Sequence, residues 1–440
     1  MNCNSNKKLN IGFVDTKAND LKAKILESLD CLPQTVTGNI WYVSSTGDNS
    51  NSGNSKDCPW RGLEAIAANA EKIKAGDAVL FERGGIYRGA VRTIGGVYYG
   101  AYGQGEKPRL YGSLKNYALT ELWQECEKNI WSCGKMAADT GIIVFGNDEF
   151  VGYKKFRKSD MKQNGDFWCD TDNTLYLYWE GNPAESYESI EIGTKITVMG
   201  LYDAPIEDIT IENICIKYTG VHAIAATDGA KNITVRYCEI GYIGGSIFKD
   251  EVRYGNGIEF FDGCENIIVE YNWIYQIYDS GFTHQGRGTY AARNIEVSHN
   301  LIEGCGMGSI EYWLAYNSQN KNYAENVTYS DNIMRNAGYC WGGIQRPDKV
   351  SSHILSNGKN QNHFINYQFK GNIFDRSSCF LMEITSLDET YPTFSDNIYI
   401  QDKGMKLGTF AKTEDVIFDD EVQRVLNKEW GDNKATIIFA

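Results

Sequence analysis

The chain has 440 residues and a net charge of −14, so most of its surface would repel a nucleic acid or another long polyanion. It is long for one compact core, yet no Pro-, Gly- or Ser-rich linker divides it, which favours one extended body. Its 45 Gly, 7 Pro, 28 Tyr, 18 Phe and 10 Trp suit short strands with tight turns and predict an all-β protein.

The N-terminus and the cysteines indicate the compartment and the cofactors. The opening residues MNCNSNKKLN lack the apolar stretch of a secretory signal, and no apolar run is long enough for a membrane span. The 12 cysteines are far apart and form no CxxC pair, so we expect free thiols and no metal site. These features predict a cytoplasmic protein without a cofactor, or a secreted one if a leader has been removed.

The first predicted elements are a short helix and the start of a solenoid. Leucine and isoleucine recur at helical spacing from Asp20 to Leu29. A strand at IWYVS, a polar loop, an amphipathic helix from about Gly62 to Ile73 and a strand from Asp77 to Phe81 follow. The order of YVS, GD-x-V-x-F and G-x-Y here resembles the opening of right-handed parallel β-helix proteins of the pectate-lyase-like superfamily. The resemblance implies that the second helix plugs one end of the solenoid.

A different pattern interrupts the solenoid after residue 113. Segments such as GIIVFG and TLYLYWEG indicate antiparallel strands with tight turns, and so an inserted β-subdomain. Near the C-terminus, FDDEVQRVLNKEWG predicts an amphipathic helix that closes the last coil. The predicted segments are an N-terminal arm (1–38), the first coils with their capping helix (39–113), the insertion (114–195), the main β-helix with the site (196–400) and the C-terminal cap (401–440).

A repeat begins after residue 200 and is the strongest signal in the sequence. The segments NITVRYCEI, NIIVEYNWI, NIEVSHNLI, NVTYSDNIM and NYQFKGNIF align, with DITIENICI as an earlier copy. From the second copy on, the spacing of 28 to 40 residues is typical of solenoid coils. One column of the alignment contains Asn213, Cys238, Asn272, Asn300, Asn332 and Asn372. We interpret these asparagines as a structural ladder at a turn rather than as catalytic groups.

A second strand follows each copy and contains the candidate chemistry. Aligning GNGIEFF, DSGFTHQ, GSIEYWL, WGGIQRP and CFLMEIT predicts that Ile258, Phe282, Ile310, Ile344 and Met382 point inward. Pleat alternation then places the next residues outward in one column: Glu259, Thr283, Glu311, Gln345 and Glu383. Strands of neighbouring coils are about 4.8 Å apart, so Glu259 and Glu311 would be roughly 9 to 10 Å apart at the backbone.

Carboxylates at such a separation suit the acid and base of a glycosidase. We predict Asp279 and Glu311 as the leading pair, Glu259 as the substitute for either, and His284 as a further catalytic group. His284 would suit the core equally well. The residues predicted to bind substrate are Trp313, Trp341, Arg346, Gln345, Thr283, Glu383 and Arg287. Among them Trp313 would stack on a sugar ring.

Three functions are open at this stage. Residues 253 to 383 resemble bacterial β-helix carbohydrate-active proteins, especially glycoside hydrolases, which implies hydrolysis of an oligo- or polysaccharide. A basic Arg346 or Arg287 beside a uronate would instead indicate a polysaccharide lyase, with calcium as a possible cofactor. Arg346 could also simply pair with Asp348. A non-catalytic glycan-binding solenoid is the third reading, and a carbohydrate is the expected partner in each.

Overall fold

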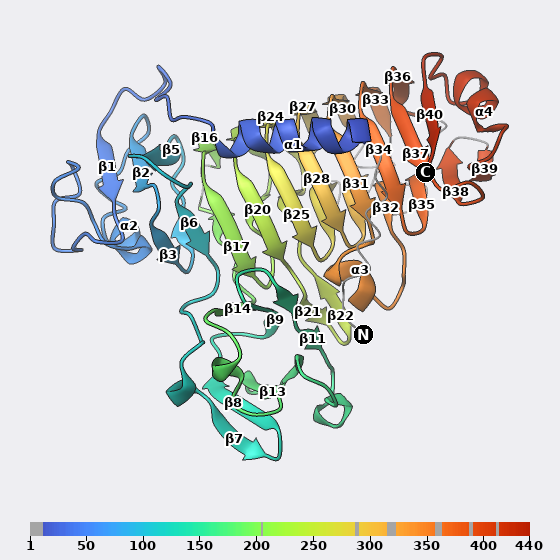
Figure 1. The fold of residues 1–440 in the computed structure, drawn as a ribbon. Coiled ribbons are helices and arrows are strands. Elements are labelled where there is room, and N and C mark those ends of the chain that lie inside the picture. The colour runs from blue at the N-terminus through green and yellow to red at the C-terminus, as the bar shows by residue number, and fades with distance from the viewer. Residues whose placement is uncertain are drawn as a thin grey trace.

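Three long sheets of stacked strands form most of the molecule (Figure 1). The structure is a computed structural model that describes residues 12–203, 206–286, 290–314, 323–356, 363–386, 390–410 and 413–440. The first sheet consists of β1 (Ile40–Val43), β2 (Ala78–Glu82), β5 (Tyr98–Tyr102), β16 (Glu207–Glu212), β19 (Ala230–Arg236), β24 (Cys264–Glu270), β27 (Ala292–Ser298), β30 (Ala324–Ser330), β33 (Phe364–Lys370) and β36 (Thr393–Ser395).

The other two sheets have the same stacked order. The second consists of β3 (Ile86–Arg88), β6 (Arg109–Tyr111), β17 (Cys215–Thr219), β20 (Glu239–Ile243), β25 (Trp273–Ile277), β28 (Leu301–Cys305), β31 (Ile333–Ala337), β34 (Ile373–Ser377), β37 (Ile398–Gln401) and β40 (Thr436–Phe439). The third consists of β4 (Val91–Arg92), β15 (Met199–Leu201), β18 (Ile224–Thr227), β23 (Ile258–Phe261), β26 (Ser280–Gly286), β29 (Gly308–Leu314), β32 (Ser352–Ser356), β35 (Phe380–Ile384), β38 (Lys406–Phe410) and β39 (Thr413–Ile417).

Each coil contributes one strand to each sheet, as β24, β25 and β26 do, and the next coil pairs with it in parallel. Only the last pair of the third sheet, β38 with β39, is antiparallel among the described strands of these sheets. Inward side chains such as Ile267, Ile274 and Phe282 form one continuous apolar core. The fold predicted from the sequence and its family resemblance, a parallel β-helix, is therefore confirmed.

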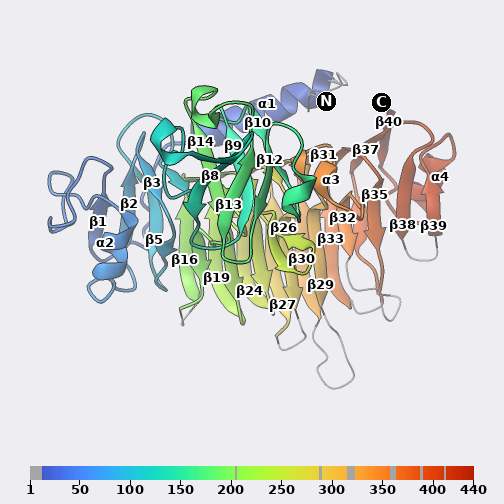
Figure 2. The same cartoon turned by 90° about the horizontal axis from the view of Figure 1, so that it is seen from below.

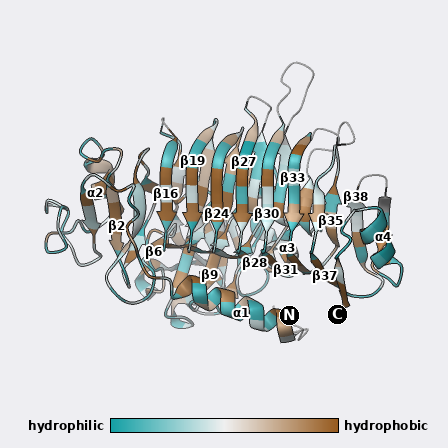
Figure 3. Ribbon diagram, turned by 90° about the horizontal axis from the view of Figure 1, so that it is seen from above, coloured by the Kyte–Doolittle hydropathy of each residue, from teal (hydrophilic) through white to brown (hydrophobic). Residues whose placement is uncertain are grey.

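Both ends of this core are covered by a helix (Figure 3). At one end α2 (Leu63–Ala68) adds Leu63 and Ile66 to the core, and at the other α4 (Val422–Lys428) adds Val425 and Leu426. An open solenoid end would expose apolar side chains to water, so these short amphipathic helices close it. Within the part of the chain that the structure describes, no helix is both long and apolar enough to cross a membrane.

The N-terminal helix lies along the outside of the second sheet rather than at an end of the solenoid (Figure 1). This helix, α1 (Gly12–Leu26), begins eight residues before the predicted start at Asp20. Its Val14, Ala18 and Ile25 pack against side chains of four successive coils: Leu301, Ile333, Ile373 and Ile400. The ion pair between Asp15 and Arg335 fixes the helix to the same coils.

The inserted subdomain lies on one side of the solenoid (Figure 2). Its strands form two small, mainly antiparallel sheets: β9 (Thr140–Phe145), β10 (Phe150–Val151) and β14 (Ile190–Thr194); and β7 (Gln124–Glu127), β8 (Ile130–Lys135), β11 (Tyr153–Lys154), β12 (Asp166–Cys169) and β13 (Thr174–Tyr178). Short 3-10 turns occur at Thr120–Leu122, Lys158–Asp160 and Pro183–Glu185. Ile142 and Val144 of β9 pack on tyrosines of the second sheet, among them Tyr218 and Tyr242. The predicted insertion is thus confirmed.

The predicted asparagine ladder is confirmed from Asn272 on, whereas Asn213 lies outside it and accepts a hydrogen bond from Lys107 Nζ (2.7 Å). The side-chain amide of Asn272 donates to Oδ1 of Asn300 (3.0 Å), and Asn300 donates in turn to Oδ1 of Asn332 (2.9 Å). Each Oδ1 also accepts the backbone N–H of the preceding asparagine, as in Asn272 N to Asn300 Oδ1 (2.9 Å). The chain of bonds continues through Asn372 and Asn397 to a buried carboxylate, Asp432. All of these side chains are inaccessible to solvent.

A second asparagine ladder, which we did not predict, runs along the first sheet. Its members have positive φ angles near 50°, a conformation that asparagine tolerates better than most residues: Asn232, Asn266, Asn294, Asn326 and Asn366. Their amides also bond from coil to coil, as in Asn294 to Asn266 (2.9 Å), but they are exposed. The eleven described cysteines are free thiols, as expected.

One predicted strand is wrong. WGGIQRP forms a helical turn, α3 (Trp341–Gln345), and the third-sheet strand of this coil is β32, eleven residues later in the sequence. The turn packs directly on the backbone of neighbouring segments: a β carbon on Gly342 would lie 2.8 Å from Ile277 O, and one on Gly343 would lie 2.2 Å from Gly338 O. The two glycines therefore serve close packing of a turn, not a strand.

Candidate active site

Two carboxylates lie on the outer face of the third sheet and are separated by one uncharged residue. Glu259 of β23 pairs in register with Thr283 of β26, and Thr283 pairs with Glu311 of β29. Leu355 occupies the next position and Glu383 the one after. The predicted column is thus present except at Gln345, whose place Leu355 takes. At about 4.8 Å per strand, the backbones of Glu259 and Glu311 are roughly 9 to 10 Å apart.

Glu311 is almost fully buried, with 2% of its surface exposed. Its Oε2 accepts hydrogen bonds from Ser280 Oγ (3.1 Å) and Gln285 Nε2 (3.0 Å), both of β26. A buried carboxylate needs such donors because desolvation otherwise disfavours its charge. The two donors also hold the carboxylate in one orientation.

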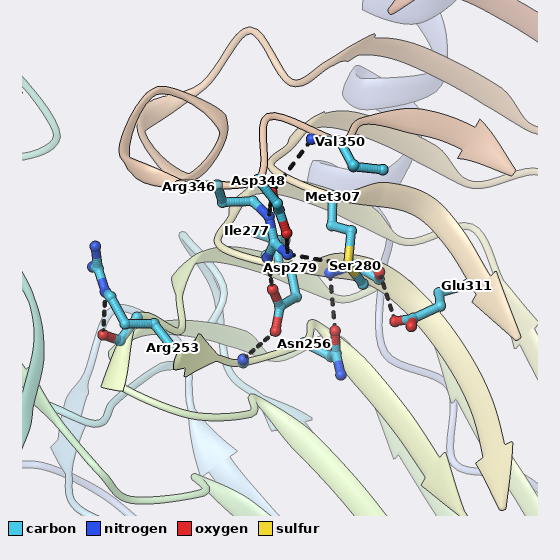
Figure 4. A network of polar contacts seen from close by, with 12 residues as sticks. Arg253, Asn256, Ile277, Asp279, Ser280, Met307, Glu311, Arg346, Asp348 and Val350 are labelled. Carbon is cyan, nitrogen blue, oxygen red and sulfur yellow. Dashed lines mark hydrogen bonds and ion pairs between the residues drawn. The ribbon is translucent and has the colours of Figure 1, made fainter. Parts of the chain in front are cut away.

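Glu259 is linked to the same network through Asn256, as Figure 4 shows in part. Asn256 Nδ2 donates to Glu259 Oε2 (2.6 Å), while Asn256 Oδ1 accepts the backbone N–H of Ser280 (2.9 Å). Ser280 then bonds Glu311 through its hydroxyl. Asn256 and Ser280 therefore tie the two glutamates together across neighbouring coils. On its other side, Glu259 Oε2 lies 3.3 Å from Nδ1 of His222.

Thr283, the residue between the two glutamates, is fully buried. Its hydroxyl oxygen has no hydrogen-bond partner among the residues that the structure describes. Buried hydroxyls are nearly always paired, so the unpaired hydroxyl of Thr283 distinguishes this position between the two carboxylates.

Asp279, predicted as one member of the catalytic pair, has a different environment. It is 7% exposed; its Oδ2 accepts the N–H of Gly255 (2.9 Å), and its Oδ1 forms an ion pair with Arg346 (Figure 4). Burial raises the pKa of the Asp279 carboxyl, and the charge of Arg346 opposes part of that rise. With both oxygens bound by the protein, Asp279 is placed to position Arg346 rather than to exchange protons with a substrate.

Arg346 is likewise held by contacts within the protein. Besides Asp279, it binds Asp348 through Nε (3.1 Å) and Nη2 (2.7 Å), as the sequence suggested, and its Nη2 lies 3.3 Å from the sulfur of Met307. The two aspartates raise the pKa of Arg346 still further above its ordinary value. A guanidinium in these ion pairs is poorly suited to remove a proton or to bind a uronate.

His284 lies inside the solenoid, on the opposite face of β26 from Thr283. Its Nε2 is 3.0 Å from the hydroxyl of Tyr367, and its ring stacks on Tyr312 with centroids 5.7 Å apart. Burial lowers the pKa of His284 to about 3. The inward alternative is therefore the observed one, and the prediction of a catalytic His284 is withdrawn for that reason.

Gln345 and Trp341 lie beneath the inserted subdomain. Gln345 Nε2 donates to Gly152 O (2.8 Å), and its Oε1 accepts from Arg253 Nη1 (3.0 Å) and from Lys154 N (3.2 Å). Trp341 is buried, with its indole N–H on the carbonyl of Gln276 (2.9 Å). Both residues fasten α3 to its neighbours instead of presenting a surface to a sugar, which corrects their predicted role.

The remaining predicted residues are spread along the same face. Trp313 is partly exposed and lies in register with Gln285 and Phe261, with its ring 6.5 Å from that of Phe261. Glu383 lines a pocket of about 540 Å³ two coils further on, together with Lys406, Thr409 and Asp415 among others. Arg287 lies outside the described residues.

Sequence reasoning missed the residues that connect the acids, namely Asn256, Ser280, Gln285 and His222. The available signal was local: Asn256 stands between two glycines just before β23, and Ser280 and Gln285 flank Thr283 on one strand. Only the bond from Asn256 to Glu259 joins residues close in the sequence, three apart. The other bonded partners are 24 or more residues apart, so spacing gives no hint of those contacts. In the described part of the chain, no group of three or more His, Cys, Asp or Glu residues is placed to hold a metal ion.

Comparisons with known proteins found similarity to solved structures only. No protein-family model and no curated protein sequence matches the chain. A glycoside hydrolase is 10% identical, with 82% of this chain and 93% of that chain covered and a TM-score of 0.48. XylC in complex with xylose is 14% identical over 86% and 73% of the two chains (TM-score 0.47). The GH136 lacto-N-biosidase from Eubacterium ramulus is 13% identical over 92% and 68% (TM-score 0.44). At these identities the likeness concerns the β-helix fold.

Proposed function

We propose that the protein is a glycoside hydrolase that uses Glu259 and Glu311 as its acid and base. The observation that carries the proposal is the position of these carboxylates on one outer face, two coils apart, with the unpaired hydroxyl of Thr283 between them. The pair differs from the one that the sequence favoured, because Asp279 is occupied by Arg346 and Gly255.

The geometry suits hydrolysis with inversion. In that reaction one carboxyl group protonates the glycosidic oxygen as the bond from the anomeric carbon to that oxygen breaks. The other carboxylate takes a proton from a water molecule whose oxygen bonds to the anomeric carbon from the opposite side. The carboxyl groups of inverting enzymes are about 6.5 to 9.5 Å apart, which leaves room for this water. The Thr283 hydroxyl would hold the water between them.

Hydrogen bonds hold the carboxylates of Glu259 and Glu311 in fixed orientations. Ser280 and Gln285 fix Glu311, and Asn256 fixes Glu259 while also binding the strand that contains Ser280. Reacting groups held in the productive orientation need no reorganisation during the reaction. Asp279 and Arg346 support this arrangement from the preceding turn, since Asp279 immediately precedes Ser280 in the chain.

A lyase reaction has less support. Arg346, one of its two predicted bases, is paired with Asp279 and Asp348, and both interactions favour the protonated guanidinium. The other, Arg287, lies outside the described residues. Removal of a proton from a uronate would require Arg346 first to lose its own. The hydrolase therefore accounts better for the charges on this face.

The test is activity on a panel of oligo- and polysaccharides, with reducing ends and ultraviolet absorbance both recorded. We expect new reducing ends without an unsaturated product. Glu259→Gln and Glu311→Gln should each lower kcat/KM at least about 10³-fold while the unfolding midpoint stays close to wild type. Glu265→Gln, a change on the first sheet, is the matched control and should retain full activity.

Other results would contradict the proposal. An ultraviolet-absorbing product would show a lyase, and glycan binding without any cleavage would show a binding protein. Wild-type activity of either glutamine variant would remove that glutamate from the mechanism.

A further inference from the structure

The face of the third sheet continues beyond Glu259 with small residues. In the register of Glu259, Ala225 is the next position and Gly200 the one after. Neither has a side chain that could fill the space above the sheet. Aromatic side chains from three separate segments border this stretch: Tyr202 after β15, and Phe248 and Tyr254 of the hairpin β21 (Ser246–Lys249) and β22 (Val252–Tyr254). We call these three residues the aromatic wall.

Direct contacts connect the aromatic wall to the carboxylate. The ring of Phe248 meets that of Tyr254 edge to face (5.5 Å), and Tyr254 meets His222 in the same way (5.4 Å). His222 Nδ1 in turn lies 3.3 Å from Glu259 Oε2. The rings of Phe248, Tyr254 and His222 thus form a continuous series of contacts that ends at Glu259.

Tyr202, which directly follows β15, borders the same stretch. Its ring lies over Gly200, where an added β carbon would come within 2.5 Å of ring atom Cε2. Burial raises the pKa of Tyr254 to about 12, and the charges of Glu259 and Tyr202 add to the effect. Glu259 likewise contributes to the raised pKa of Tyr202. The charge of Glu259 therefore acts on both phenol groups.

The aromatic wall is open to solvent, since Phe248 is 67% and Tyr202 50% exposed. Exposed large aromatics that gather beside polar groups commonly mark a binding surface. A pyranose ring matches such a surface because its C–H face packs on aromatic rings while its hydroxyls bond to carboxylate, imidazole and phenol groups. The carboxylate of Glu259 and the ammonium of Lys195, 5.3 Å from the centre of the Tyr254 ring, have opposite charges that offset each other beside this wall, which favours an uncharged sugar.

We propose that Tyr202, Phe248 and Tyr254 form a subsite for an uncharged sugar unit of the glycan that is cleaved between Glu259 and Glu311. This inference rests on the proposed function for the location of the cleaved bond. Trp313 and Phe261 lie in register with Gln285, beside the acid column. The substrate would then run along the solenoid axis, with its units beyond Glu259 on the aromatic wall.

Binding is measured on the Glu311→Gln background, so that the result does not depend on turnover. The probes are neutral xylo-, cello- and manno-oligosaccharides of two to six units, with oligogalacturonides of the same lengths for comparison, and calorimetry gives Kd. The double variant Tyr202→Ala/Phe248→Ala should weaken binding of the longer neutral ligands about tenfold or more, since each stacked ring contributes several-fold. The shortest ligand that binds should be affected least.

Tyr339→Ala is the matched control, because Tyr339 is also 50% exposed but lies in the turn before α3. It should leave Kd unchanged, and circular dichroism checks that each variant is folded. Four results would each overturn the subsite. The double variant could keep its affinity for every neutral ligand that binds, or lose the same affinity at all lengths. The protein could instead prefer oligogalacturonides, or bind no neutral ligand at all. If length-dependent weakening is found but no glycan is cleaved, the subsite stands and the proposed hydrolysis fails.

Discussion

The same stacking of coils builds two columns of side chains: the inner asparagine ladder, and the acid column of Glu259, Thr283 and Glu311. The two columns differ in which residues they contain and in what those residues bond to. In the ladder the same residue recurs, and each amide bonds to the identical group of the next coil. In the acid column the residue changes from coil to coil, and the glutamates bond to side chains outside the column, namely Asn256, Ser280 and Gln285. One residue thus repeats where the coils support each other, and the residue varies where we propose the site.

The largest effect expected from this contrast is on stability. Asn300→Ala would leave the backbone N–H and the amide of Asn272 without their acceptor, and Val269 O without its donor. Unpaired buried groups cost about 1 to 3 kcal/mol each, so we expect a loss of about 3 to 5 kcal/mol in the free energy of unfolding. Denaturant unfolding measures this loss, and the kcat of the folded fraction should change less than about twofold.

The control for the ladder is Asn294→Gly in the exposed series. Glycine accepts the positive φ of 52° at this position, so the change removes the side-chain bonds to Asn266 and from Asn326 without adding strain. We expect a loss within about 1 kcal/mol, as is usual at exposed sites. An equal loss for Asn300→Ala and Asn294→Gly would show that burial is not what gives the inner ladder its importance.

The next largest effect is on the pH dependence of stability, and it comes from buried histidines on the strands of the site. Burial lowers the pKa of His284 to about 3 and that of His353 to about 4, whereas an unfolded histidine titrates near 6.5. The unfolded chain therefore binds protons first, and stability falls as the pH drops from about 6.5 toward 4. The slope reaches about 2.7 kcal/mol per pH unit for two protons.

His284→Phe should remove roughly half of that slope, as followed by urea unfolding between pH 7 and 4.5, and it should retain most of the activity. Strong loss of activity in a stably folded His284→Phe variant would return this histidine to the mechanism. An unchanged slope would show that His284 is protonated alike in both states.

The smallest effect concerns Asn256, which links Glu259 to Ser280 and through it to Glu311. Asn256→Ala should lower kcat/KM about 10- to 100-fold, because a misplaced Glu259 reacts from a poorer geometry. The pH optimum should shift as well, which a purely structural defect would not cause. Asn366→Gly in the exposed ladder should change neither. Full activity of Asn256→Ala would show that Glu259 is positioned by other groups.

The sequence by itself determined the architecture. Strand periodicity, the recurring asparagines and the amphipathic helices at both ends are local patterns, and stacking similar coils is the simplest way to bury their apolar faces. The registers of Glu259, Thr283, Glu311 and Glu383 followed from alternation along strands, because side chains of a strand point to opposite faces in turn.

Only the tertiary structure decided which groups are available for chemistry. The sequence could not show that Arg346 forms an ion pair with Asp279 or that His284 lies inward. It also could not show that WGGIQRP forms a helical turn, so that the third-sheet strand of this coil is Ser352–Ser356. These outcomes depend on contacts between coils and on loops of unequal length, which alignment of the repeats does not contain. The electrostatic state of a carboxylate is set by its neighbours in space, and here those neighbours are far away in the chain.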